Sequence, residues 1–504
     1  MRNQKRFGLL LSYINLALGM IMNFVLTPML ITAFSDETYS LYRVIQSMAG
    51  PLVVFNLGLA GVTTRCVAQY RSSENADPRE KQNMLAMVLL IAAVMAVVII
   101  LIGMVMIHCV PYLYGKTYPE ELLLLAKKLL TVFVISAAIN VLSDIFRGCI
   151  NGNERFVYKS AVGIIQTVFR FGMSVFCVRI GMGVLSIALA GLAGNLVVLL
   201  LMVLYSVGTM GERFRLYRWD HREFKIMLSF SAAILLQTLV NQVNNHMDVV
   251  ILGAMVMEKK LITMYSSALT IYAVYNSLLS VVPELFLPQT IRMVHQNHSG
   301  EELTDLMIRA GRIQSTLSVG ILIPFGLFGK EFITLWIGSS YENAYYVALL
   351  LMIPATVPLV QNSCLNILDA KLKRLFRSVV LVCMAGLNLI ITVILVRDMG
   401  YWGAAIGTCI SLIIGHGVIM NLYYRKALGL NVLRMFSEIF QGILPCGILA
   451  GAVCIVVAGE QTVSIGLLVW KCLLFCGCYG TLLWLFGWNA EERIQIRYFL
   501  RKQL

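Results

Sequence analysis

Long apolar runs recur along almost the whole chain, and they constrain its fold more than any other feature. We count about fourteen of them, each close to the ~20 residues that a helix needs to cross a bilayer. Hydrophobic residues make up 59% of the chain and charged residues only 13%, with a mean hydropathy of +0.80. No soluble domain of useful size fits between the runs. The sequence therefore predicts an all-α polytopic membrane protein.

The formal charge of +14 alternates along the chain and does not gather in one patch. Basic residues concentrate at the N-terminus and in every second loop after it, most densely at 208–225, whereas the alternate loops hold few. This is the pattern of the positive-inside rule. We therefore expect a multi-pass protein of the cell (plasma or inner) membrane with both termini in the cytoplasm, and the charge does not indicate nucleic-acid binding.

The spans group into two sets of six and a final pair. We expect a six-helix lobe at 1–207, a cytoplasmic linker at 208–226, a second six-helix lobe at 227–430, and an appended helix pair with a basic cytoplasmic tail at 431–504. Six spans return the chain to the same side of the membrane, so the two lobes would be parallel copies. The first helix of each set leads through a short loop to a tyrosine-containing helix entry, at Tyr39 and Tyr265.

The first span of the second set, 230–252, carries many polar side chains between apolar flanks. Five of them share a stripe about 100° wide on one helix face: Gln237, Asn241, Asn244, Asn245 and Asp248. His246 lies beside that stripe, and Asn15 and Asn23 share a similar one in the first span. Polar groups cannot face hydrocarbon unpaired. Helix–helix hydrogen bonding would suit one or two such residues, so the two stripes favour the walls of a central transport cleft.

Several short patterns, in order and spacing, resemble those of polysaccharide flippases in the multidrug/oligosaccharidyl-lipid/polysaccharide exporter superfamily. They are Pro28 followed by Val54-Phe-Asn-Leu-Gly-Leu-Ala-Gly61, Gly152-Asn-Glu-Arg-Phe156, Asn245-His-Met-Asp248, and Tyr401-Trp-Gly-Ala-Ala-Ile-Gly-Thr408. The resemblance covers the first twelve spans, and the final pair is similar to that of some members. It implies translocation of an isoprenoid-diphosphate-linked oligosaccharide from the inner to the outer leaflet for cell-surface polysaccharide synthesis. It also implies membrane lipids, glycosyltransferases and a polysaccharide polymerase as partners.

Such a substrate needs cations for its diphosphate and amides or hydroxyls for its sugars. Arg170, in the middle of the fifth span, is our candidate cation because a mid-span charge must face a cleft or a partner. Arg43, at one end of the second span, is another candidate, and extension of its side chain to the membrane interface is the alternative. Glu284 lies on a polar stripe of the eighth span. Asp248, His246 and Glu284 are the titratable candidates for ion coupling, although a structural, hydrogen-bonded role for Asp248 fits equally well.

Three further expectations are local. Asp144 and Arg147 are spaced to pair with each other on one helix, and Lys471 should extend towards the membrane surface. The prolines at 354 and 358, followed by Gln361-Asn-Ser363, suggest a bent tenth span.

No catalytic signature is present in the sequence, neither a nucleotide-binding loop nor a His-Glu-x-x-His motif, so we expect no enzyme activity and no cofactor. The cysteines at 472, 476 and 478 share one apolar helix and do not suggest a metal site. Two alternatives stay open. A multidrug or toxin cation antiporter of the same superfamily would have a smaller, acidic pocket, and a membrane enzyme or assembly factor would not transport at all.

Overall fold

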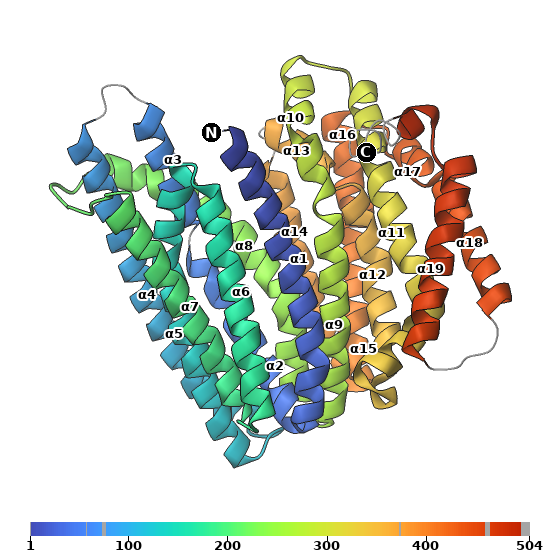
Figure 1. Ribbon diagram of the computed structural model, residues 1–504, viewed down its shortest axis with the longest axis horizontal. Coiled ribbons are helices and arrows are strands. Elements are labelled where there is room, and N and C mark those ends of the chain that lie inside the picture. The colour runs from blue at the N-terminus through green and yellow to red at the C-terminus, as the bar shows by residue number, and fades with distance from the viewer. Residues whose placement is uncertain (1, 57, 73–76, 372–373, 459–463, 495–504) are drawn as a thin grey trace. The chain divides into compact units, whose positions relative to one another are not determined.

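The computed structural model describes residues 2–56, 58–72, 77–371, 374–458 and 464–494, and these residues form helices joined by short loops, with no β-strand among them (Figure 1). Within this part of the chain, twelve helices are long and apolar enough to cross a membrane, or up to thirteen when the bent pair Ala344–Val360 and Cys364–Ala370 is one span. The expected span that is not among these is α8 (His221–Met255), which is 35 residues long. The predicted all-α polytopic fold is confirmed, and about fourteen spans is a close approximation.

The chain forms two compact units, Met1–Thr263 and Met264–Leu504. In the first unit the helices besides α8 are α1 (Arg2–Ala33), α2 (Asp36–Ala49), η1 (Gly50–Asn56), α3 (Leu59–Ser72), α4 (Pro78–Tyr114), α5 (Glu120–Gly152), α6 (Phe156–Arg179), α7 (Val184–Val203) and η2 (Leu204–Thr209). Helix α5 packs against α2, α3, α4 and α7, while α1 packs along α6 (Figure 1). Helix α8 packs within this unit against α2 and η1.

The second unit begins within α9 (Lys259–Leu279). It continues with α10 (Val282–His295), α11 (Gly300–Ile337), η3 (Ser339–Tyr341), α12 (Ala344–Val360), α13 (Cys364–Ala370), α14 (Arg374–Met399), α15 (Tyr401–Leu412), η4 (Ile413–Met420), α16 (Asn421–Leu428), α17 (Val432–Phe440), α18 (Ile443–Ala458), α19 (Ile465–Leu482) and η5 (Leu483–Gly487). Helix α11 is central, because it packs against α10, α12, α17, α18 and α19.

Prolines break several spans that the hydropathy pattern presents as continuous. The second span divides at Gly50-Pro51 into α2, η1 and α3, and the eighth divides into α9 and α10 just before Pro283. Proline has no N–H, so the carbonyl four residues earlier loses its helical partner. In the eighth span that carbonyl, at Leu279, accepts a hydrogen bond from Gln314 Nε2 at 3.3 Å, which offsets the loss. The expected bend of the tenth span is confirmed, at 45°.

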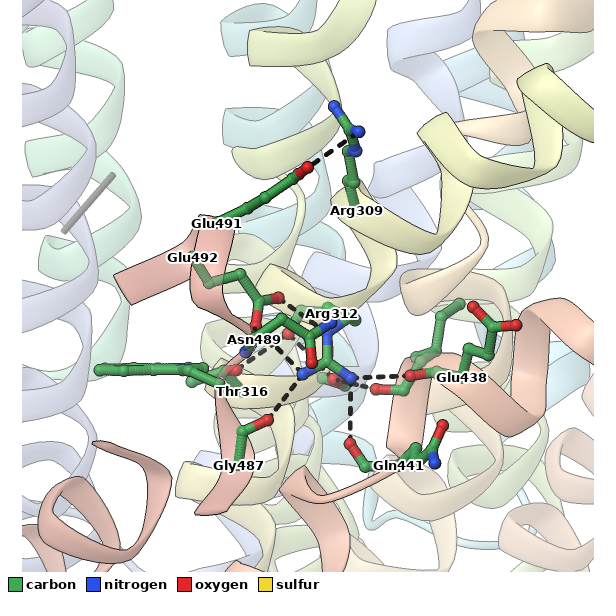
Figure 2. Close-up of polar contacts among 12 residues, drawn as sticks. Arg309, Arg312, Thr316, Glu438, Gln441, Gly487, Asn489, Glu491 and Glu492 are labelled. Carbon is green, nitrogen blue, oxygen red and sulfur yellow. Dashed lines mark hydrogen bonds and ion pairs between the residues drawn. The ribbon is translucent and has the colours of Figure 1, made fainter. Parts of the chain in front are cut away.

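Two charged contacts tie α11 to the C-terminal part of the chain, one to residues that flank α18 and α19 and one to α19 itself. The guanidinium of Arg312 in α11 is 4% exposed and donates to both carboxylate oxygens of Glu492, at 2.7 and 3.1 Å (Figure 2). It also donates to the backbone carbonyls of Glu438, Gln441 and Gly487. These carbonyls lie at the C-terminal ends of α17 and η5, where the last carbonyls of a helix have no N–H partner within the helix. The single guanidinium of Arg312 therefore supplies hydrogen-bond donors to the ends of both helices.

The second contact is buried in the span. Lys471 Nζ in α19 lies 2.8 Å from Glu331 Oε1 in α11, and the lysine is 2% exposed. The expectation that Lys471 extends to the membrane surface is therefore wrong, because an acidic partner on another helix holds it inside. The expected pair of Asp144 and Arg147 is confirmed, with 3.0 Å between Oδ1 and Nη1.

Candidate functional site

A seam of polar contacts joins α1 to α6 in the first unit. The hydroxyls of Ser12 and Ser160 lie 2.8 Å apart, and Thr167 Oγ1 donates to Asn15 Oδ1 at 3.0 Å. The helices approach closely because Gly163 faces Asn15, where an added Cβ would come within 2.7 Å of Asn15 Nδ2. At this end of α1, the polar stripe is thus satisfied by helix–helix hydrogen bonds.

Further along the same seam, Arg170 of α6 meets Asn23 of α1. Arg170 Nη2 donates to Asn23 Oδ1 at 3.0 Å, and both side chains are exposed. Among the residues that the structure describes, Arg170 has no acidic partner. An unneutralised guanidinium in the middle of a span is too costly to face lipid. The face of the first unit that carries Arg170 therefore suits a water-filled or ligand-filled space.

Arg43 of α2 lies close to this face. Its Nη1 donates to Gln46 Oε1 at 3.3 Å, and its side chain is half-buried. The buried Tyr42 hydroxyl lies within electrostatic range of the guanidinium groups of both Arg43 and Arg170. Two guanidiniums from different helices thus act on the same tyrosine through electrostatics. Guanidinium groups bind phosphate oxygens through paired N–H donors, so this wall has the chemistry of an anion site.

The polar stripe of α8 is divided between exposed and buried positions. Asn241 and Asn245 are exposed, whereas Asp248 is 4% exposed and already has an interaction partner. The ring of His246 lies against Gly50 at the end of α2, and it is within electrostatic range of Arg43. The side chain of Gln237 lies outside the described part of the chain.

The remaining candidate, Glu284, lies in the second unit. It is exposed at the start of α10. The structure thus brings Asn15, Asn23, Arg43 and Arg170 to one region of the first unit, with His246 near Arg43. The ion-coupling roles of Asp248, His246 and Glu284 stay predictions.

Sequence reasoning missed the partners that α6 offers to α1. Ser160, Gly163, Thr167 and Arg170 recur at helical spacing and fall within about 80° of one face. This stripe matches the small and polar stripe of α1, so a search for complementary stripes would have paired the two helices. Tyr42 had no such signal, because its position relative to Arg170 depends on how α2 packs.

Comparisons with known proteins agree with this architecture. A family model described as "Polysaccharide biosynthesis protein" matches residues 76–346, more than half of the chain. No curated protein matches the chain significantly in sequence. Among solved structures, "Lipid II flippase MurJ, inward closed conformation" is similar, with a TM-score of 0.72, 14% identity, and coverage of 94% of this chain and 97% of that chain.

A second similar structure is the "Inward-facing conformation of a multidrug resistance MATE family transporter of the MOP superfamily". It has a TM-score of 0.62 and 13% identity, and the match covers 84% of this chain and 99% of that chain. At such identities the likeness concerns the fold. The predicted family resemblance is confirmed by the match to the family model of polysaccharide biosynthesis proteins, and the likeness in fold agrees with it.

Proposed function

The chain belongs to the family of polysaccharide biosynthesis proteins, and from this membership we propose that it is a flippase for an isoprenoid-diphosphate-linked oligosaccharide. It moves this substrate from the cytoplasmic to the outer leaflet of the cell membrane, with both termini in the cytoplasm. Glycosyltransferases that build the glycan and a polymerase that consumes it are the partners that such a step requires.

The observation that carries the proposal is the exposed guanidinium of Arg170, held by the neutral Asn23 within a span. A diphosphate has closely spaced anionic oxygens, and Arg170 with Arg43 offers planar donors that match them. The exposed amides of Asn241 and Asn245 supply donors and acceptors of the kind that sugar hydroxyls need. When the diphosphate binds, it replaces water around the guanidiniums of Arg43 and Arg170. A carrier that closes around the headgroup keeps that water out.

In this mechanism the substrate headgroup crosses while the lipid tail stays in the bilayer. The protein alternates between a state open to one leaflet and a state open to the other, and the ligand can shift this equilibrium only by its difference in affinity for the two states. Asp248, His246 and Glu284 are the groups through which a proton or sodium gradient would act. A multidrug cation antiporter is the alternative, but an unneutralised arginine repels a cationic drug.

The experiment is deletion of the gene followed by analysis of lipid-linked sugars. We expect the sugar-loaded carrier to accumulate on the cytoplasmic leaflet. Complementation with Arg170→Ala should lower the flipping rate ~10- to 100-fold, since a hydrogen bond to a charged group contributes about 1.5–3 kcal/mol. Arg170→Lys should restore part of it, because lysine keeps the charge but not the paired donors.

The matched control is Arg179→Ala, which removes an exposed arginine from the end of the same helix and should complement fully. Drug sensitivity with normal lipid-linked sugars in the deletion strain would overturn the proposal in favour of the antiporter. Full activity of Arg170→Ala would show that Arg170 does not bind the diphosphate, and it would leave the family membership intact.

A further inference from the structure

The segment 211–220 joins η2 to α8 without helical structure, yet it is firmly held, and we call it the strap. Its first anchor is Glu212, which is 6% exposed. The Glu212 carboxylate accepts hydrogen bonds from Lys81 Nζ at 2.6 Å and from Asn153 Nδ2 at 3.0 Å. Two residues later, the ring of Phe214 packs edge-on against Phe146, with 5.4 Å between centroids. The first half of the strap is thus fixed to α4 and α5.

The second half is held through its backbone. Asn83 Oδ1 accepts hydrogen bonds from the N–H groups of Tyr217 and Arg218, at 2.8 and 2.9 Å. The Tyr217 hydroxyl donates to Gln82 Oε1 at 2.9 Å. Asp220 then caps α8 by accepting from the N–H groups of the first helical turn. These contacts fix the backbone of the strap against α4 and α5. Because the backbone is fixed, the side chains that point outward form a defined surface.

That surface is basic and apolar at once. Arg213, Arg215 and Arg218 are exposed, because inward and outward side chains alternate along the first half of the strap. Between and beside them, Leu216 is 48% and Trp219 42% exposed. Aromatic and apolar side chains interleaved with long cations are typical of the membrane–water interface, where the rings enter the headgroup layer and the cations meet phosphates.

The acidic residues of the strap do not neutralise this surface. Glu212 is turned inward and paired with Lys81. Asp220 is occupied as the cap of α8, and its Oδ2 lies 3.8 Å from Arg218 Nη2, so it offsets part of one charge. The guanidiniums of Arg213 and Arg215 have no acidic partner among the described residues.

We propose that the strap binds the headgroups of anionic phospholipids in the leaflet at its own end of the spans. The apolar surface continues directly into it, because Leu204 and Val207 of η2 are exposed just before the strap begins. Headgroup phosphates are therefore the anions outside the protein that its arginines can reach. A cation near an anionic leaflet is stabilised by the surface potential, and this attraction is screened by salt. The inference does not depend on which substrate the protein carries.

The test uses the full-length protein in nanodiscs with Trp219 as the sole tryptophan, the other five being replaced by phenylalanine. Brominated phosphatidylglycerol or brominated phosphatidylcholine, at equal mole fraction, serves as the quencher. We expect stronger quenching of Trp219 by the brominated phosphatidylglycerol, and a smaller difference at high salt. The triple variant Arg213→Gln, Arg215→Gln, Arg218→Gln should abolish the difference, whereas three Arg→Lys changes should keep it.

The matched control is Lys116→Gln, Lys128→Gln, Arg179→Gln, which removes three exposed cations of the first unit near the ends of α4, α5 and α6 that are opposite the strap. It should leave the quenching of Trp219 unchanged. In the otherwise native chain, native mass spectrometry should show phosphatidylglycerol affinity falling about tenfold in the strap triple variant and less than twofold in the control. This second measurement decides the question if the single-tryptophan protein does not fold.

Equal quenching by the two lipids would overturn the proposal, as would an equal loss of phosphatidylglycerol affinity in both triple variants. Absence of quenching by either lipid would also overturn it, because the strap would then stand away from the bilayer and its surface would suit an acidic protein instead. A failure of the proposed flipping activity would leave all of these readouts unaffected, so the two proposals fail separately.

Discussion

The buried ion pair of Lys471 and Glu331 allows a sharp test of what holds the appended helices. Lys471 Nζ donates to both carboxylate oxygens, at 2.8 and 3.0 Å, and the side chains are only 2% and 10% exposed. Replacing Lys471 by methionine leaves the Glu331 carboxylate buried without its counter-charge. We expect this to lower the free energy of unfolding by about 3–5 kcal/mol. Replacing both residues by methionine should cost far less, or even stabilise, because no buried charge remains.

A neighbouring pair supplies the control. Lys330 and Glu342 also form an ion pair, but their side chains are 48% and 35% exposed, so Lys330→Met should cost less than about 1 kcal/mol. The measurement is a double-mutant cycle for each pair, with unfolding by dodecyl sulfate in mixed micelles followed by tryptophan fluorescence. The reasoning is refuted if Lys471→Met costs no more than Lys330→Met, or if the double methionine variant is as unstable as the single one.

Two further predictions concern α8. In Gly50→Ala the new Cβ would lie 2.6 Å from the His246 ring, so we expect a loss of about 1–3 kcal/mol in unfolding free energy. Gly19→Ala, which meets nothing within 4 Å, should be neutral or slightly stabilising, and equal losses in both would contradict this account. The backbone N–H groups of Glu223 and Arg222 hold the pKa of Asp220 below its ordinary value of 3.8. The Asp220 cap should therefore stabilise α8 fully above pH 3.8, and its contribution should decrease as the pH falls through the lowered pKa. Hydrogen exchange of the backbone amides in the first turn of α8 measures this. Protection of those amides that does not change at low pH would contradict the role of the cap.

The features that could be predicted from the sequence are those whose causes lie within a few turns of one helix. Apolar runs indicated the helices because only a helix satisfies its own backbone in lipid. Asp144 and Arg147 could be paired from their spacing, since residues three apart share a helix face. The bend after Pro354 and Pro358 likewise follows from local chemistry.

Contacts between helices distant in the chain could not be predicted in this way. Lys471 looked like a surface-directed cation because its partner, Glu331, lies 140 residues away. The polar stripe of α1 indicated the wall of a transport cleft, but part of this stripe forms hydrogen bonds with α6. That Arg170 donates to Asn23 depends on how α1 and α6 pack, which the sequence does not show. For α8, the sequence indicated an amphipathic helix but not the neighbour of each polar side chain. The expected lobe boundary at 208–226 stays a prediction, while contacts group α8 with the first unit.

The arginine that joins α11 to the appended helices imposes an order on assembly. Arg312 is synthesised with α11, whereas the carboxylate that neutralises it, at Glu492, is synthesised 180 residues later. The carbonyls of Glu438, Gln441 and Gly487 that also accept from this guanidinium follow Arg312 by 126, 129 and 175 residues. The full set of contacts around Arg312 can therefore form only after the chain has been synthesised as far as Glu492.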